Sequence, residues 1–196
     1  MRSTADTQTN KLFTIPNLLS LIRIALIPLI VWAYCARQNS LLTAILLAVS
    51  GLTDALDGII ARKHGLISDL GKALDPIADK LTQAAMLLCL ISRFPLMLMP
   101  FLLLLVKETV VGLTSLEVIR RSGKVYGALW HGKATTFLLY AVILLHLLWQ
   151  QIPAQTSTIL IWLCSGMMLF SFLLYAVRNV YLLRAHKKSA KKNRRR

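Results

Sequence analysis

Residues 54–79 read DALDGIIARKHGLISDLGKALDPIAD, and this stretch holds five of the chain's eight acidic residues. Asp54 and Asp57 are three positions apart, whereas Asp75 and Asp79 are four positions apart. Both spacings place the members of a pair on one face of a helix. Because only a short segment separates the pairs, we expect two antiparallel neighbouring helices whose carboxylates face each other across one interface.

The segments on either side of this stretch are strongly apolar. Hydrophobic residues make up 56% of the 196 residues, and the mean hydropathy is +0.62. The apolar runs extend to about 20 residues with their flanks, which is enough to cross a bilayer, and a lipid-exposed backbone must satisfy its own hydrogen bonds. The sequence therefore predicts an all-α integral membrane protein with six transmembrane helices. We expect the first to begin near Pro16 and the others to cover about residues 41–61, 71–91, 96–119, 134–149 and 158–183.

The formal charge of +15 favours a membrane surface over nucleic acid as the partner. With six spans, the loops on one side would carry only Arg37 and Arg93, and the other basic residues would gather on the opposite side. This bias predicts a multi-pass protein of the cytoplasmic membrane with both termini in the cytoplasm. The acidic pairs, and with them the active site, would then lie at the cytoplasmic face.

The distribution of polar and apolar residues predicts that the chain has three parts. Residues 1–11 are a polar arm, residues 12–183 form the six-helix membrane domain, and residues 184–196 are a basic cytoplasmic tail. We expect the tail to be disordered and to be held to anionic lipid headgroups.

Four carboxylates gathered in one place would repel one another unless cations compensate their charge. An all-oxygen ligand set suits Mg²⁺, Mn²⁺ or Ca²⁺ better than zinc or copper. Two such ions would suit phosphoryl transfer, because they stabilise both the attacking and the leaving oxygen. The small residues Gly58, Ala61 and Gly71 would let a bulky ligand approach the helix backbone, and Arg62 is placed to clamp a diphosphate.

The pattern D-x2-D-G-x2-A-R-x8-G-x3-D-x3-D, from Asp54 to Asp79, resembles the signature of the CDP-alcohol phosphotransferases at every fixed position. The resemblance implies transfer of a phosphatidyl group from CDP-diacylglycerol to an alcohol with release of CMP, and pairing of the chain as a homodimer. It also implies that Asp54, Asp57, Asp75 and Asp79 bind Mg²⁺ or Mn²⁺, as two ions. Asp79 would in addition be the general base for the acceptor hydroxyl. The residues implied to contact the CDP-lipid are Gly58, Ala61, Arg62, Ser68, Gly71, Asn17 and Ser20.

The identity of the acceptor is less specific in the sequence. Residues 14–23 (TIPNLLSLIR) and 74–80 (LDPIADK) resemble stretches of phosphatidylglycerophosphate synthases and of the related cardiolipin synthases. We therefore expect glycerol-3-phosphate as the acceptor, with phosphatidylglycerol, inositol phosphate or serine as alternatives. Lys107-Glu108 stands where the glycerophosphate enzymes have Arg-Glu, and residues 132–136 (GKATT) lack the second lysine of their GKxKT. The candidate residues for binding the acceptor are Lys107, Arg121 and Lys133, with Lys80 as a further candidate.

Two other classes of protein fit the composition. A cation transporter would hold its carboxylates near the middle of the bilayer, whereas these lie at helix ends beside Gly58 and Arg62. A non-catalytic scaffold is expected to have lost a signature aspartate, and all four are present. His131 is interpreted as a residue of the membrane interface rather than as a catalyst.

Overall fold

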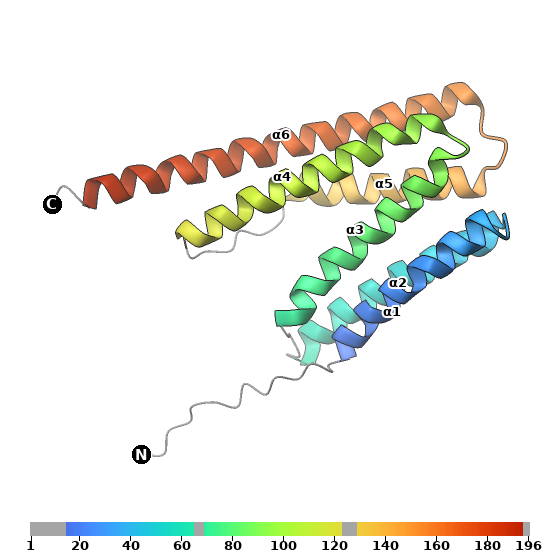
Figure 1. Ribbon diagram of the computed structural model, residues 1–196, viewed down its shortest axis with the longest axis horizontal. Helices are drawn as coiled ribbons and strands as arrows, with labels where there is room; N and C mark the ends of the chain where they lie inside the picture. Colours follow the sequence, from blue (N-terminus) through green and yellow to red (C-terminus); the bar gives the residue numbers. More distant parts are fainter. Residues whose placement is uncertain (1–14, 65–68, 123–128, 194–196) are drawn as a thin grey trace, which may run out of the picture. The chain divides into compact units, whose positions relative to one another are not determined.

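The computed structural model describes residues 15–64, 69–122 and 129–193, and it describes side chains over 18–53, 76–121 and 129–184. Within these ranges every regular element is a helix and there is no strand, so the predicted all-α class is confirmed (Figure 1). The elements are α1 (Ile15–Cys35), α2 (Ser40–His64), α3 (Asp69–Ile91), the short 3₁₀-helix η1 (Pro95–Met97), α4 (Leu98–Ser122), α5 (Trp130–Leu148) and α6 (Ala154–Asn193). The chain divides within α3 into two compact units, unit 1 (residues 1–86) and unit 2 (residues 87–196).

In unit 1, α1 and α2 form an antiparallel pair, as Figure 1 shows. Their contact buries apolar side chains of both helices, among them Ile30 and Ala33 of α1 and Ala44 and Leu47 of α2. Because small alanine side chains alternate with larger aliphatic ones, the two helix backbones can approach closely. Packing against α1 therefore supports α2, the helix that carries the first half of the acidic signature.

The turn between α1 and α2 is short and well capped. Gln38 adopts a left-handed backbone conformation with a φ of 48°. Asn39 then caps α2, since its Oδ1 accepts a hydrogen bond from the backbone N–H of Leu42 at 2.9 Å. The hydroxyl of Thr43 also donates to the carbonyl of Asn39, at 2.8 Å. These contacts fix the point at which the chain reverses direction.

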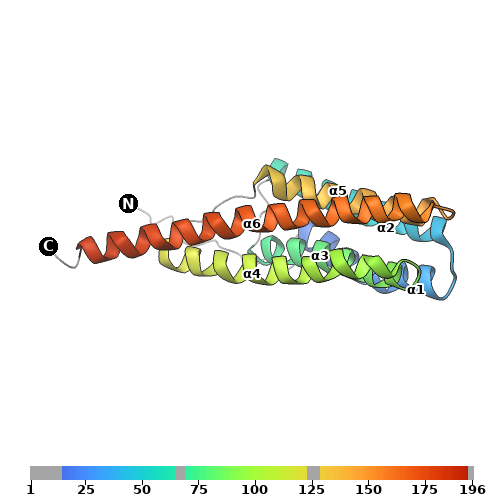
Figure 2. The same ribbon diagram turned by 90° about the horizontal axis from the view of Figure 1, so that it is seen from above.

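In unit 2, α4 and α5 both pack against α6, and Figures 1 and 2 agree on this arrangement. The buried core comes from all three helices and includes Leu104 of α4, Leu139 and Ile143 of α5, and Ile161 and Met168 of α6. The helix α6 is therefore the central element of this unit, and it contributes side chains to both neighbours.

A buried histidine fastens the end of α5 to the start of α6. His146 Nδ1 lies 2.8 Å from the carbonyl oxygen of Val142, and its Nε2 lies 2.9 Å from Ser157 Oγ. Because a carbonyl can only accept, Nδ1 is the donor and Nε2 accepts from the Ser157 hydroxyl. Both ring nitrogens of His146 are thus satisfied inside the protein.

Several helices are long and apolar enough to cross a membrane. Among the described residues, four spans meet this condition: Leu18–Cys35, Pro95–Arg121, Trp130–Leu148 and Ala154–Arg184. Large apolar side chains such as Phe137 and Ile159 are exposed on them, as expected of a surface that faces lipid. The chain is therefore a multi-pass membrane protein. In α2, the part whose side chains the structure describes, Ser40–Thr53, is also apolar.

The helix boundaries differ from the expected ones mainly in the last two helices. The helix α5 begins at Trp130, about one turn before the predicted start near residue 134. The helix α6 continues to Asn193, so the prediction of a disordered tail is wrong for residues 184–193. Alanine, lysine and arginine are good helix formers, and basic residues are favourable at a helix C-terminus, so the tail prolongs α6.

Candidate functional site

The acidic signature occupies the end of α2 and the first half of α3. Asp54, Asp57, Gly58, Ala61 and Arg62 lie on α2, and Gly71, Asp75 and Asp79 lie on α3. Ser68 lies outside the described residues. Except for that of Asp79, the side chains of these signature residues also lie outside the described part, and so does that of Asn17 at the start of α1. The predicted convergence of the four carboxylates therefore stays a prediction.

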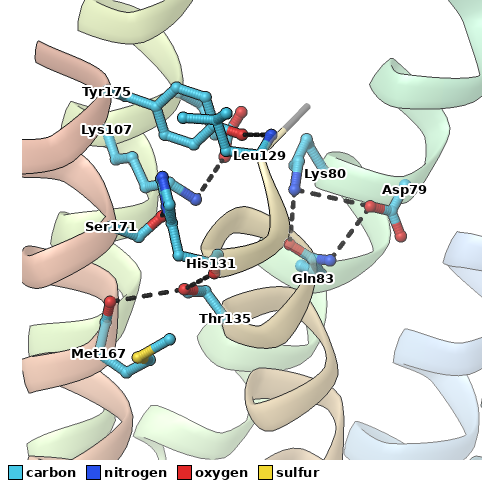
Figure 3. A network of polar contacts seen from close by, with 11 residues as sticks. Asp79, Lys80, Gln83, Lys107, Leu129, His131, Thr135, Met167, Ser171 and Tyr175 are labelled. Atoms are coloured by element: carbon cyan, nitrogen blue, oxygen red, sulfur yellow. Dashed lines mark hydrogen bonds and ion pairs between the residues drawn. The ribbon is translucent and has the colours of Figure 1, made fainter. Parts of the chain in front are cut away.

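Asp79 is held by two neighbours on its own helix. Its Oδ2 accepts a hydrogen bond from Gln83 Nε2 at 3.2 Å and lies 3.6 Å from Lys80 Nζ. Lys80 Nζ in turn donates to Gln83 Oε1 at 3.5 Å, so the three side chains form a closed triangle (Figure 3). Because Gln83 Oε1 accepts from Lys80, the amide nitrogen of Gln83 faces the Asp79 carboxylate and donates to it.

Burial strengthens this arrangement. Gln83 is fully buried, whereas the side chain of Asp79 is 26% exposed. A buried amide keeps few alternative orientations, so it holds the carboxylate plane in a defined direction. The carboxylate meanwhile remains partly accessible.

Sequence reasoning missed Gln83. The available signal was an amide side chain four residues after Asp79, inside a run that is otherwise largely apolar. Residues four apart share a helix face. Position 83 could therefore have been recognised as a neighbour of the last signature aspartate.

On α1, the expected CDP-lipid contact Ser20 is fully buried, and Arg23 one turn later is only 2% exposed. A charged side chain buried in a membrane helix is costly unless it is partnered. Both polar side chains therefore lie in the interior of the protein and not on its lipid-facing surface.

The three candidate acceptor-binding residues lie in unit 2 but in different surroundings. Lys107 is buried on α4, and its Nζ lies 3.3 Å from Oε1 of the adjacent Glu108. Arg121, at the exposed end of α4, pairs with Glu117 at 2.6 Å. Lys133 is exposed on the first turn of α5. Of the three, only Lys107 occupies an interior position.

The donor chemistry of the signature fits a hard divalent cation. Among the side chains that the structure describes, no three His, Cys, Asp or Glu residues gather, but three of the four expected ligands lie outside that part. A carboxylate has two oxygens and about four lone-pair positions. The bond from Gln83 to Oδ2 of Asp79 is therefore compatible with metal ligation by the same carboxylate.

Comparison with known protein families gives one match that covers most of the chain. The family described as CDP-alcohol phosphatidyltransferase matches residues 13–182. This range includes the whole acidic signature, begins two residues before α1 and reaches into the second half of α6.

Individual relatives carry two kinds of name. A Streptomyces coelicolor protein named "Cardiolipin synthase (CMP-forming)" is 39% identical over 145 residues, which cover 70% of this chain and 67% of the relative. A Rickettsia bellii "CDP-diacylglycerol--glycerol-3-phosphate 3-phosphatidyltransferase" is 38% identical over 99 residues, or 50% of this chain and 55% of the relative. A Mycobacterium tuberculosis "Probable phosphatidylglycerophosphate synthase" is 30% identical over 156 residues, or 77% of this chain and 74% of the relative. The match thus spans about half the length of the Rickettsia protein and more of the other two.

Proposed function

Because the chain belongs to the CDP-alcohol phosphatidyltransferase family, we propose that it transfers the phosphatidyl group of CDP-diacylglycerol to glycerol-3-phosphate. The products are phosphatidylglycerophosphate and CMP, which places the enzyme in phospholipid biosynthesis. The observation that carries this proposal is the complete signature on α2 and α3, whose last aspartate is held by Gln83 and Lys80. Relatives named for this activity support the choice of acceptor.

The reaction requires a proton acceptor close to the acceptor hydroxyl. The hydroxyl oxygen attacks the phosphorus that carries diacylglycerol, and the bond from that phosphorus to the oxygen shared with the CMP phosphate breaks. Asp79 accepts the hydroxyl proton, and CMP leaves with the bridging oxygen. Gln83 and Lys80 keep the Asp79 carboxylate in one orientation, so that it meets the hydroxyl without first having to reorient.

Metal ions would be held by Asp54, Asp57, Asp75 and Asp79, as two Mg²⁺ or Mn²⁺ ions. When bound, they would supply neutralisation of the diphosphate charge. The role of the four aspartates is then to present oxygen ligands from two successive helices. Gly58, Ala61 and Gly71 would give the nucleotide access to the helix backbones. Arg62, Ser68, Asn17 and Ser20 would provide polar contacts to it.

The membrane arrangement that suits this function has six spans and both termini in the cytoplasm. CDP-diacylglycerol joins two acyl chains to a water-soluble nucleotide, so a site at the cytoplasmic face of the cell membrane serves both halves. The basic end of α6 would contact anionic lipid headgroups. Two copies of the chain would pair as a homodimer.

The second candidate function keeps the chemistry and changes the acceptor to phosphatidylglycerol. The observation that favours it is the similarity to the Streptomyces cardiolipin synthase. Inositol phosphate and serine are further alternatives, since Lys107 and the segment 132–136 depart from the glycerophosphate enzymes.

Release of CMP from the full chain tests these functions directly. The detergent-solubilised protein is given CDP-diacylglycerol, Mg²⁺ and one acceptor at a time. Release with glycerol-3-phosphate is the expected result. Release with phosphatidylglycerol alone would replace the acceptor but keep the chemistry. If a folded, metal-loaded sample releases no CMP with any acceptor, the transferase proposal is wrong and the non-catalytic scaffold becomes the better account.

Gln83→Leu should lower the turnover number about 10-fold. The substitution keeps the volume but removes the amide that orients Asp79, and a lost positioning contact of this kind acts on the chemical step. Thr82→Val is the matched control, because Thr82 is equally buried but its hydroxyl donates to the backbone carbonyl of Ala78. Equal turnover in the two variants would show that Gln83 does not position Asp79.

A further inference from the structure

A cluster of polar and basic side chains occupies the place where α5 begins in unit 2. His131 comes from the first turn of α5, Lys107 comes from α4, and Ser171, Tyr175 and Arg178 come from α6. Figure 3 shows the side chains of Lys107, His131, Ser171 and Tyr175 gathered in this place. Three helices thus meet at a polar site inside spans that are otherwise apolar.

His131 is the central member of this cluster, and only one of its ring nitrogens has a hydrogen-bond partner in the part of the chain that the structure describes. The residue is 2% exposed. Its Nδ1 lies 2.9 Å from Ser171 Oγ, whereas its Nε2 is buried and has no hydrogen-bond partner among the described residues. A buried polar group without a partner is destabilising, so a ligand that supplies the partner is favoured. A second histidine on the same helix shows the contrast, since both ring nitrogens of His146 have hydrogen-bond partners.

The surroundings hold the imidazole in place. The rings of His131 and Tyr175 pack edge to face, with centroids 4.8 Å apart. The Tyr175 hydroxyl accepts a hydrogen bond from the backbone N–H of Leu129 at 2.9 Å, which ties α6 to the start of α5. A methyl group at Gly132 would lie 2.6 Å from that hydroxyl, so the absence of a side chain there allows Tyr175 to sit against α5. The direction of Nε2 is therefore fixed by the packing.

The charge around His131 is positive. The ammonium of Lys107 and the guanidinium of Arg178 are both close enough to act electrostatically on its ring. The guanidinium carbon of Arg178 also lies 5.0 Å from the centre of the Tyr175 ring. The first turn of α5 adds the positive end of a helix dipole. Glu108 offsets part of this charge at Lys107, but the cluster as a whole suits an anion.

We propose that His131 is a further acceptor-binding residue, whose Nε2–H donates a hydrogen bond to a phosphate oxygen of the acceptor beside Lys107 and Arg178. The tautomer that does this is the one in which the Ser171 hydroxyl donates to Nδ1, because Nε2 then carries the proton. This inference rests on the proposed function, since it names the group that recognises a phosphorylated glycerol. The phosphate belongs either to free glycerol-3-phosphate or to the headgroup of phosphatidylglycerol.

Two substitutions at position 131 distinguish the contributions of the two ring nitrogens, Nδ1 and Nε2. Asn places an amide nitrogen near the position of Nδ1 and leaves nothing at Nε2, whereas Gln places one near Nε2. Ser171→Ala removes the partner that holds the ring without touching His131. His146→Asn is the matched control, because it removes a buried, serine-bonded histidine from the same helix.

The KM for each substrate is measured from CMP release by the solubilised full chain. His131→Asn should raise the KM for glycerol-3-phosphate about 10-fold or more, the effect of losing a hydrogen bond to a charged group. His131→Gln should retain most of the affinity, Ser171→Ala should give an intermediate value, and the KM for CDP-diacylglycerol should stay the same in each. His146→Asn should lower the melting temperature and leave both KM values unchanged. If only phosphatidylglycerol is used, the same changes should appear in its KM.

Two results would overturn the inference in an active enzyme. One is an unchanged acceptor KM in His131→Asn. The other is an equal rise of donor and acceptor KM in both His131→Asn and His131→Gln, which would mark a structural role.

If the wild-type protein releases no CMP, the proposed function is wrong. Equilibrium binding then still tests whether His131 binds a phosphate group. Calorimetric titration with glycerol-3-phosphate and with inorganic phosphate should then show binding that His131→Asn weakens about 10-fold. Absence of binding to the wild type, or equal binding by the variant, would contradict the inference.

Discussion

The Asp79→Asn variant should release CMP at least about 10³-fold more slowly than the wild type, since general-base catalysis typically contributes 10²–10⁴-fold. The substitution keeps the size of the side chain but removes its negative charge and its ability to accept a proton. It also places an amide opposite Gln83 Nε2 and Lys80 Nζ, which now face the carboxylate oxygen. The measurement is the rate of CMP release at saturating substrates, together with circular dichroism to verify the helices.

The matched control for this experiment is Asp69→Asn. Asp69 is the first residue of α3 and belongs to the same acidic stretch, but it stands outside the signature. Its variant should keep the wild-type rate within about a factor of two, since we expect Asp69 to be a solvated residue that holds none of the fixed positions of the signature. If Asp79→Asn retained a tenth of the activity, or if both variants lost activity equally, Asp79 would not be the general base.

The helical framework was predictable because membrane insertion imposes it. Apolar runs of about 20 residues must be helical in lipid, and the start of α1 near Pro16 follows from the preference of proline for a first turn. The predicted helix boundaries were wrong where contact with lipid does not determine the backbone conformation. The start of α5 at Trp130 depends on the bond from the Leu129 N–H to Tyr175, a residue 46 positions away. No local pattern encodes such a contact.

The same limit applies to the site. Aspartates at fixed spacings on two successive helices are visible in the sequence because their periodicity is local. Gln83 was detectable in principle by its spacing from Asp79. The surroundings of His131 were not, because Ser171 is 40 positions away and comes beside it only when α5 packs on α6. The sequence pattern therefore predicts an interfacial histidine, whereas His131 is buried between helices.

Removal of divalent cations should abolish CMP release, and Mg²⁺ or Mn²⁺ should restore it. Four aspartates supply only oxygen ligands, which hard cations prefer. Without the cations, these carboxylates would face a diphosphate of the same sign of charge, and substrate binding would be lost together with turnover. The measurement is CMP release after treatment with a chelator, followed by titration with each metal ion.

The Asp57→Asn variant tests the metal requirement at a single expected ligand. Asp57 lies on α2 within the signature, and loss of one of four carboxylates should raise the Mg²⁺ concentration needed for half-maximal activity about 10-fold or more. Asp69→Asn, which removes one negative charge from the same acidic stretch, should leave that concentration unchanged. This comparison separates ligation from general electrostatic attraction, because both variants change the net charge equally. Full activity of the chelated wild type, or an unchanged metal requirement in Asp57→Asn, would contradict a metal site built from the signature aspartates.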